Sequence, residues 1–363
     1  MTDHTFAPTG RAVTQEDREL AELIETMRRG VADAPEIYRP GEFWDGLIAA
    51  NLEMLRTDGI ANFKRTVSNN YYNWLVTSPL DPQVRNAAVA WLRRPSLTPC
   101  RTRLEEPMTG LRTVDRGQAY DLSSFAARRY TFFVGVLWDI AVRGDTHRLT
   151  SRLAEPEIGN PAPLRSRGRL ISQDLANSII EFTFAARSGA VGDGARVAEL
   201  GAGYGRLAYV YAHAHDLTYC VFDIPPALAV AQWYLTRTLG KDRIVAYSRE
   251  TDFGRIESRL TPGTVAFFTP DQLDLFPDGW FGLTQTISTL PEMPAPQSAH
   301  YLGLLAAKSG RAVFLKQWRQ WRNEADQVDL REEHYRLPEP WYLHLRRTDP
   351  VQPAFFNQLW LRS

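Results

Sequence analysis

The stretch Val197-Ala-Glu199-Leu-Gly201-Ala-Gly203-Tyr-Gly205 decides how the second half of this 363-residue chain folds. An apolar run ends in three glycines, each two residues apart, and the segment Leu207–His215 follows with a helical pattern. Glycine permits a tight turn and lets a ligand approach the backbone to a distance that a side chain would block. The stretch therefore predicts a β-strand, a ligand-contacting glycine loop and an α-helix.

A second apolar run, Tyr219–Phe222, ends in the carboxylate Asp223, eighteen residues after Gly205. In nucleoside-binding α/β domains, an acid at this position accepts hydrogen bonds from the ribose hydroxyls. Ordinary turn glycines with a capping acid are the structural alternative. We expect a nucleoside cofactor whose contacts lie on the loop and on the second strand tip, at Glu199, Gly201, Ala202, Gly203, Tyr204, Asp223 and Ile224.

From Arg196 onward, short apolar runs alternate with helical segments, which is typical of β-α-β units and a parallel sheet. Trp341–Arg347 and Phe355–Leu361 predict an antiparallel pair at the end of the sheet. Helical patterns dominate before residue 150, including one over Ala61–Val76. The predicted fold class is α/β: a Rossmann-like sheet with a C-terminal antiparallel hairpin, preceded by a mostly helical N-terminal domain.

Four segments follow from this pattern. We expect a flexible tail over residues 1–13, a helical N-terminal domain over 14–150 that caps the acceptor, a linker over 151–170, and a cofactor-binding domain over 171–363. The linker is placed where Pro, Gly and Arg are frequent.

Two nucleoside cofactors fit such a loop, NAD(P) and S-adenosyl-L-methionine. The dinucleotide fingerprint places its third glycine three residues after the second, where this chain has Arg206. A terminal antiparallel hairpin also suits a class I methyltransferase sheet better. We therefore expect S-adenosyl-L-methionine, which yields S-adenosyl-L-homocysteine, with Glu199 close to the methionine ammonium group. An NAD(P)-dependent oxidoreductase is the alternative.

Composition disfavours two classes of partner. Lys+Arg and Asp+Glu both number 42, so the basic excess typical of nucleic-acid binders is absent from the sequence. The most apolar stretch, Phe132–Val142, is too short to span a bilayer, and Met1–Arg11 has no signal-peptide core. We expect a cytoplasmic protein with a small-molecule acceptor and without a nucleic-acid or membrane partner. The oligomeric state stays open.

The chain resembles the sugar O-methyltransferase family of bacteria, within the class I S-adenosylmethionine-dependent methyltransferases. The resemblance covers roughly residues 40–345 and lies in Gly59–Trp74, Ser172–Ser178, Gly201–Arg206, Asp223–Pro225, Pro270–Gln272, Ser288–Met293 and Leu315–Trp318. Ala198 is a minor departure, because most such sequences have a larger aliphatic residue there. The resemblance implies a Rossmann-like catalytic domain and a helical region that shapes the acceptor pocket.

Methyl transfer to a sugar hydroxyl benefits from a base that removes the hydroxyl proton. Glu292, beyond the fourth strand, is the first candidate for this base or for anchoring the acceptor hydroxyl; a helix cap is its structural alternative. His300 is the second candidate, because an imidazole has a suitable pKa, although a helix-face histidine is more often structural.

Further contacts are expected around the loop. Ser288 lies at a strand tip beside the cofactor, Gln272 offers a donor and an acceptor to the adenine edge, and Gln173 is a candidate for the methionine end. The candidate acceptor-binding residues are Asn69, Tyr72, Asp174 and His334. No metal site is predicted, because no histidines or acids show ligand spacing.

These inferences predict a methyltransferase that acts on a hydroxyl of a sugar, nucleotide sugar or glycosylated natural product. Methylation of a nitrogen or of a non-sugar oxygen remains an alternative, as does a non-catalytic relative that binds the cofactor or a partner enzyme.

Overall fold

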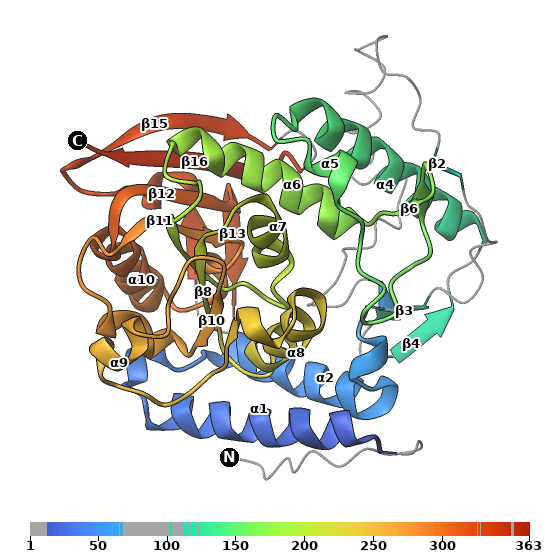
Figure 1. Ribbon diagram of the computed structural model, residues 1–363, viewed down its shortest axis with the longest axis horizontal. Coiled ribbons are helices and arrows are strands. Elements are labelled where there is room, and N and C mark those ends of the chain that lie inside the picture. Colours follow the sequence, from blue (N-terminus) through green and yellow to red (C-terminus); the bar gives the residue numbers. More distant parts are fainter. Residues whose placement is uncertain are drawn as a thin grey trace.

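The computed structural model describes residues 13–64, 66–67, 102–103, 112–115, 118–121, 124–324, 326, 328–349 and 352–363. A central twisted sheet carries helices on both faces, and the N-terminal helices α1 and α2 lie along one side of the molecule (Figure 1). In the described ranges, no helix is long and apolar enough to cross a membrane.

Eight strands form the central sheet in the order β15-β16-β12-β11-β7-β8-β10-β9. The strands from β12 to β9 are parallel, whereas β16 is antiparallel to both β12 and β15. This arrangement confirms the predicted Rossmann-like fold class with its C-terminal hairpin. The bounds are β7 Arg196–Leu200, β8 Thr218–Phe222, β9 Ile244–Val245, β10 Val265–Phe268, β11 Phe281–Ile287, β12 Ser309–Trp318, β15 Trp341–Thr348 and β16 Phe355–Arg362.

The chain reverses its direction of travel across the sheet between β7 and β11. From β7 it proceeds to β8 and β10 on one side, and later to β11 and β12 on the other. In open α/β sheets, ligands bind in the crevice outside the carboxyl ends of the strands at such a switch point. The strand order therefore places a ligand crevice beside Leu200 and Ile287.

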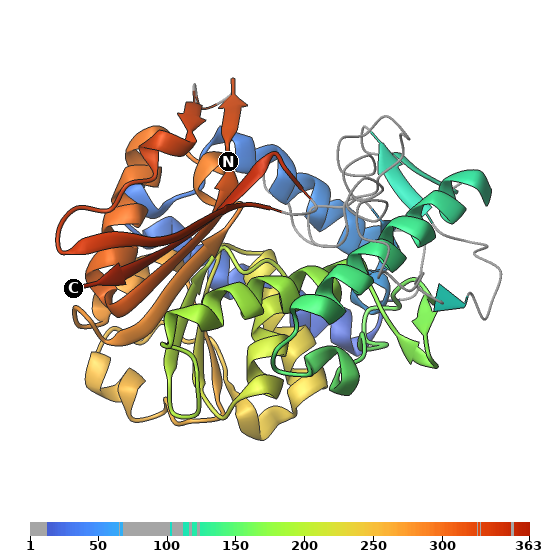
Figure 2. The same ribbon diagram turned by 90° about the horizontal axis from the view of Figure 1, so that it is seen from above.

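Both faces of the sheet are buried along β8 and β10, which explains why these strands are nearly continuous apolar runs. Val197 and Val221 belong to one hydrophobic cluster, together with residues of α6 Gln173–Ala185, α7 Arg206–Ala214 and α8 Ala227–Leu239. Ala198 and Cys220 belong to a second cluster with α9 Phe253–Glu257 and α10 Ala295–Lys308. Figure 2 shows these two helical layers with the sheet between them.

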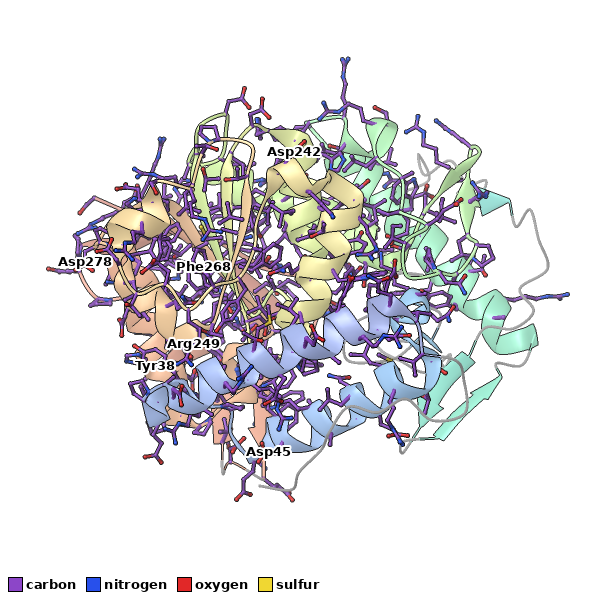
Figure 3. All side chains as sticks on the ribbon, turned by 60° about the horizontal axis from the view of Figure 1, so that its bottom comes forward. Tyr38, Asp45, Asp242, Arg249, Phe268 and Asp278 are labelled. Atoms are coloured by element: carbon purple, nitrogen blue, oxygen red, sulfur yellow. The ribbon has the colours of Figure 1, made fainter. Side chains whose placement is uncertain are left out.

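The N-terminal region is helical, as predicted. Its helices are α1 Gln15–Asp33, α2 Glu42–Asp58, α4 Ser124–Gly144 and α5 Leu149–Arg152. A reciprocal capping box between Thr14 and Asp17 begins α1, which packs against α8, while α4 packs against α6. Figure 3 shows the face that α1 and α2 cover, with Tyr38 and Arg249 near the end of α1. These helices share a core with the sheet, since Leu20 and Ile24 belong to the first cluster.

Short strands complete the described chain. They are β1 Thr66–Val67, β2 Thr102–Arg103, β3 Arg112–Asp115, β4 Gln118–Asp121, β5 Arg165–Ser166, β6 Arg169–Leu170, β13 Gln320–Asn323 and β14 Val328–Arg331. Helical turns of the 3-10 type lie at Glu36–Tyr38, Ile60–Asn62, Ala186–Ser188, Lys241–Arg243, Pro270–Leu275, Leu290–Glu292 and Glu332–His334.

The helix expected over Ala61–Val76 is wrong in its described part. Ile60–Asn62 forms only a 3-10 turn, and Thr66–Val67 pairs with β3 as a strand. Two consecutive β-branched residues favour this extended conformation. The candidate acceptor residues Asn69 and Tyr72 lie outside the described residues, and the four domain boundaries stay predictions.

Candidate functional site

A pocket lies at the carboxyl ends of β7, β8 and β11, at the switch point of the sheet. It gathers predicted residues from the start of α6, the glycine loop, the tip of β8 and the turn after β11. These residues are Gln173, Asp174, Glu199, Gly201, Ala202, Gly203, Tyr204, Asp223, Ile224, Ser288 and Glu292. Segments more than a hundred residues apart in sequence thus form one site.

The glycine loop brings the backbone to the pocket surface. Gly201 has a φ of +76°, and a Cβ atom added there would lie 2.0 Å from the Thr289 Oγ1 atom. Gly203 has a φ of +58°, yet an added Cβ would meet no atom of the described chain within 4 Å. Gly201 is therefore required by close packing, whereas Gly203 exposes its backbone to open space in the pocket.

Asp223 is anchored by two backbone amides. Its Oδ2 atom accepts a hydrogen bond of 2.7 Å from the Gly203 amide, and its Oδ1 atom accepts one of 2.7 Å from the Ile224 amide. Burial raises the pKa of Asp223 to about 7, although the two amide donors oppose that shift. Each carboxylate oxygen has a further lone pair, so the group can also accept hydrogen bonds from a ligand.

Glu199 lies at the end of β7 with its carboxylate against Tyr219. The Tyr219 hydroxyl donates a hydrogen bond of 2.6 Å to Oε2 of Glu199, and Gln285 donates to the Tyr219 oxygen at 2.7 Å. Burial raises the pKa of Glu199 to about 7. A bound cation would stabilise the ionised form and lower this pKa.

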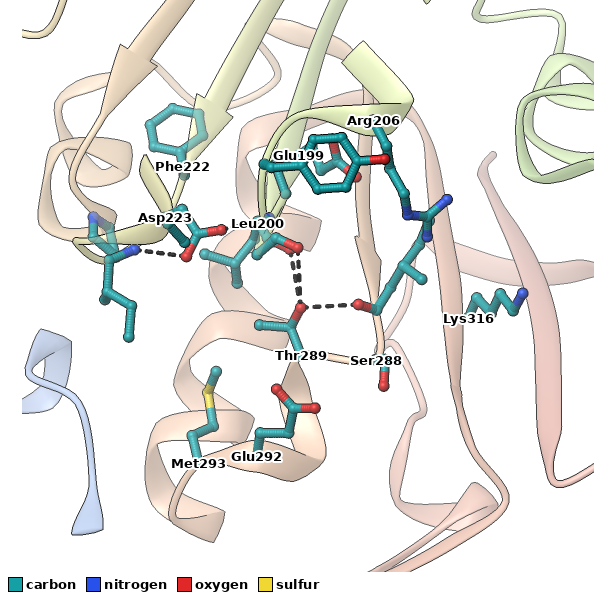
Figure 4. Close-up of a pocket in the computed structure, with 18 of the residues that line it drawn as sticks. Glu199, Leu200, Arg206, Phe222, Asp223, Ser288, Thr289, Glu292, Met293 and Lys316 are labelled. Carbon is teal, nitrogen blue, oxygen red and sulfur yellow. Dashed lines mark hydrogen bonds between the residues drawn. The ribbon is translucent and has the colours of Figure 1, made fainter. Parts of the chain in front are cut away.

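The turn after β11 places Ser288, Thr289 and Glu292 on the pocket wall. Ser288 has a φ of +58°, its amide donates to the Lys316 carbonyl at 2.8 Å, and its hydroxyl accepts from the Trp318 indole at 3.1 Å. The Glu292 carboxylate has no hydrogen-bond partner among the described residues. Figure 4 shows it below Thr289, pointing into the pocket. Burial and the charge of Asp223 raise the pKa of Glu292 to about 8.

One face of α6 forms another wall. Gln173, Asn177 and Glu181 follow one another at helical spacing, and all three line the pocket. The Oε1 atom of Gln173 is buried and has no partner in the part of the chain that the structure describes. Asp174 accepts a hydrogen bond of 2.9 Å from the Tyr204 hydroxyl, and burial raises its pKa to about 6.

A buried ionic cluster lies beside this wall, and the sequence interpretation did not include it. The Glu181 carboxylate contacts Arg206 Nη1 at 2.6 Å and Lys316 Nζ at 2.9 Å, and Lys316 also contacts Asp349 at 3.1 Å. Arg206, Glu181 and Lys316 line the pocket. One sequence pattern could have predicted part of this cluster: Glu181 lies at helical spacing from the candidate residue Gln173, so both would be expected on one face of the same helix.

The N-terminal region closes one side of the pocket through Tyr38, Pro40 and Trp44. The Gln297 side chain of α10 holds this segment, because its amide donates to the carbonyls of Ile37 at 2.7 Å and Arg39 at 2.8 Å. These cap residues were also missed, since only the tertiary structure brings them to the carboxyl edge of the sheet.

Three predicted residues do not line this pocket. The Gln272 amide is used internally: its oxygen accepts from the Thr269 amide at 3.1 Å, and its nitrogen donates to the Ser248 and Glu250 carbonyls. This capping arrangement explains why the Gln272 amide does not line the pocket, whereas Pro270 does.

The two histidines also lie elsewhere. His300 has its Nε2 atom 3.0 Å from the hydroxyl of Tyr38, and Tyr38 lines the pocket whereas His300 does not. His334 lines a separate hollow between α10 and the loop before β15, where its Nδ1 atom accepts from the Arg331 amide at 3.1 Å. Within the described ranges, no group of three or more His, Cys, Asp or Glu side chains is placed to hold a metal ion.

Comparisons with known proteins give likenesses in structure but not in sequence. No family model matches the chain, and no curated protein matches it. One similar structure is a magnesium protoporphyrin IX methyltransferase from Synechocystis PCC 6803 with bound SAM, at 14% identity, 52% coverage of this chain, 79% of that chain and a TM-score of 0.37. Another is a SAM-dependent methyltransferase from Aquifex aeolicus, at 12% identity, 49% and 87% coverage and a TM-score of 0.33. The fold assignment rests on this chain's own strand order.

Proposed function

We propose that this protein is a class I methyltransferase that uses S-adenosyl-L-methionine to methylate a hydroxyl group of a sugar or glycosylated small molecule. The observation that carries the proposal is the composition of the switch-point pocket. It combines an exposed glycine backbone, an amide-anchored Asp223 and an unpartnered Glu292 carboxylate.

The residues present fit the amino-acid nucleoside. Asp223 can accept hydrogen bonds from both ribose hydroxyls, because an ionised carboxylate offers four lone-pair sites and the amides of Gly203 and Ile224 use two. Gln173 has a buried acceptor without a partner among the described residues, and Glu199 adds a carboxylate on the same pocket. Both suit an ammonium group. Ile224 and Pro270 offer apolar contacts to the base.

The alternative cofactor, NAD(P), fits this pocket less well. Dinucleotide sites require a small residue at the third fingerprint position so that the helix packs closely against the strand. Arg206 occupies that position, and its side chain lines the pocket. The antiparallel strand β16, between β12 and β15, also departs from the all-parallel order of the dinucleotide fold.

When bound, the sulfonium nucleoside supplies an electrophilic methyl group. The chain's own contribution is to position the acceptor and to accept a proton. Transfer of that methyl group to an acceptor hydroxyl would leave a proton for the chain to accept. The Glu292 carboxylate takes the hydroxyl proton, and its raised pKa favours that transfer.

Aromatic side chains at the pocket support a carbohydrate acceptor. Trp44 and Phe355 both line it, and Phe355 lies 4.2 Å from the Trp318 ring centroid. Aromatic faces bind the apolar face of a sugar ring, while carboxylates and amides bind its hydroxyls.

Calorimetric titration tests the cofactor first. We expect S-adenosyl-L-homocysteine to bind and NAD(P)H to produce no binding heat; the reverse result refutes the methyltransferase assignment. A panel of glycosides, nucleotide sugars, catechols and amines with labelled S-adenosyl-L-methionine then tests the acceptor. Cofactor binding with methyl transfer only to catechols or amines would refute the sugar acceptor while leaving the enzyme class in place.

A further inference from the structure

The Arg206 guanidinium is held at one nitrogen only. It begins α7, directly after the glycine loop, and its Nη1 atom donates to Ser178 Oγ at 2.8 Å and to Glu181 Oε2 at 2.6 Å. Glu181 is in turn fixed by Lys316. The charge and the plane of the guanidinium are therefore set by α6 and β12 before any ligand enters.

The other donors of Arg206 belong to a side chain that lines the pocket. Its Nη2 and Nε atoms make no hydrogen bond to any residue that the structure describes, and 22% of the side chain remains accessible. A planar guanidinium with a free pair of donors matches the two oxygens of a carboxylate. The N-terminus of α7 adds a positive dipole at the same place.

Gln173 supplies the complementary group on the same wall. It lies five residues before Ser178, an α6 residue that Arg206 Nη1 contacts, which corresponds to about 7.5 Å along the helix axis. Its buried Oε1 atom is an acceptor without a partner among the described residues. A carboxylate and an ammonium on one carbon atom, each with a hydrogen bond of about 3 Å, can bridge such a separation.

We propose that Arg206 binds the α-carboxylate of the amino-acid portion of the nucleoside, while Gln173 Oε1 accepts a hydrogen bond from its α-ammonium group. This inference rests on the proposed function and extends it, because it assigns the zwitterionic end of the cofactor to named side chains. It also gives a physical role to the arginine that replaces the third fingerprint glycine: the site selects an amino-acid nucleoside over a dinucleotide.

The experiment compares two ligands that differ only in one carboxylate. S-adenosyl-L-homocysteine and its decarboxylated analogue, 5′-(3-aminopropylthio)-5′-deoxyadenosine, are titrated into the wild-type protein, Arg206→Gln and Arg206→Lys. Arg237→Gln is the matched control, because Arg237 also pairs with a glutamate, at 2.7 Å, yet does not line the pocket.

We expect Arg206→Gln to weaken S-adenosyl-L-homocysteine binding by about ten- to a hundredfold, since a charged hydrogen-bonded pair is lost. The decarboxylated analogue should bind to the wild type and to Arg206→Gln with the same affinity within about threefold. The S-adenosyl-L-homocysteine affinity of Arg206→Lys should lie between those of the wild type and Arg206→Gln, because lysine keeps the positive charge but lacks the paired N–H donors of the guanidinium. Arg237→Gln should leave both affinities unchanged.

Two results overturn the role of Arg206. One is equal weakening of both ligands in Arg206→Gln, which would show a general disturbance of the pocket. The other is unchanged S-adenosyl-L-homocysteine affinity in that variant. If Arg206→Gln does not fold, Arg206→Lys provides the test. A loss of affinity for S-adenosyl-L-homocysteine that exceeds the loss for the decarboxylated analogue supports the role of Arg206, and equal losses refute it. Failure of the wild type to bind S-adenosyl-L-homocysteine would instead refute the proposed function itself.

Discussion

Cofactor affinity should rise with pH between 6 and 8 because Asp223 must be ionised to accept both ribose hydroxyls. Burial raises the pKa of Asp223 to about 7 in the free protein. The carboxyl is then about 9% ionised at pH 6 and about 91% ionised at pH 8. Apparent affinity scales with the fraction of competent protein, so it should increase about tenfold over this interval.

The direction of this pH dependence follows from the pKa of Asp223 in the free protein and in the complex. Ribose hydroxyls that donate to the carboxylate stabilise its ionised form, so the complex holds Asp223 at a lower pKa than the free protein does. Well below pH 7, each binding event therefore releases close to one proton. Above pH 8, it releases only a small fraction of a proton, because Asp223 is already ionised in the free protein.

The assay is calorimetry with 5′-methylthioadenosine at pH 6, 7 and 8, in two buffers of different ionisation enthalpy. This ligand has the ribose but no amino-acid portion, so titration of Glu199, whose pKa is also raised to about 7, contributes little. Asp223→Asn is the control and should bind more weakly, with an affinity independent of pH. A wild-type affinity that is flat from pH 6 to 8, or the same slope in Asp223→Asn, would refute this reasoning.

Three further outcomes are expected. Glu292→Gln should lower kcat by about 10²- to 10⁴-fold and remove the rising limb of the kcat/KM profile near pH 8, with S-adenosyl-L-homocysteine affinity unchanged; full activity would exclude it as the base. Gly201→Ala should reduce the unfolding free energy by about 1–3 kcal/mol more than Gly203→Ala does, because only the first meets Thr289; equal thermal shifts would contradict this packing. His300→Ala should change kcat by no more than about twofold, since His300 does not line the pocket, and a larger loss would restore it as a catalytic candidate.

The fold class and the central part of the site were predictable from the sequence. The glycine spacing at Gly201–Gly205 and the acid Asp223 belong to two consecutive strands and their loops, so a local pattern suffices to place them. The sequence also predicted Glu292 at this edge, because its turn directly follows the strand adjacent to β7, and Glu292 lines the candidate pocket. Hydrophobic runs predicted the strands for the same reason: a parallel strand buried on both faces is apolar throughout.

Other contacts depended on packing that no local pattern contains. Gln272 had the right chemistry and the right strand, yet its amide closes a backbone turn and contacts Ser248. His300 lies one residue before the pocket-lining Tyr301, and its imidazole contacts Tyr38 from another segment. In each case the orientation of one side chain decided whether the predicted residue lines the pocket.

The sequence by itself determined the sheet, its glycine loop and the acids at its strand tips, because these features follow from short-range periodicity and turn chemistry. Only the tertiary structure placed Arg206 between Ser178 and Glu181, linked Glu181 to Lys316, and laid Tyr38 and Trp44 over the crevice. These partners come from elements far apart in the chain, and their contacts exist only after the two faces of the sheet have been covered. A buried charge keeps its position through such long-range partners, which is why the charged wall of this pocket could not be predicted from residue order.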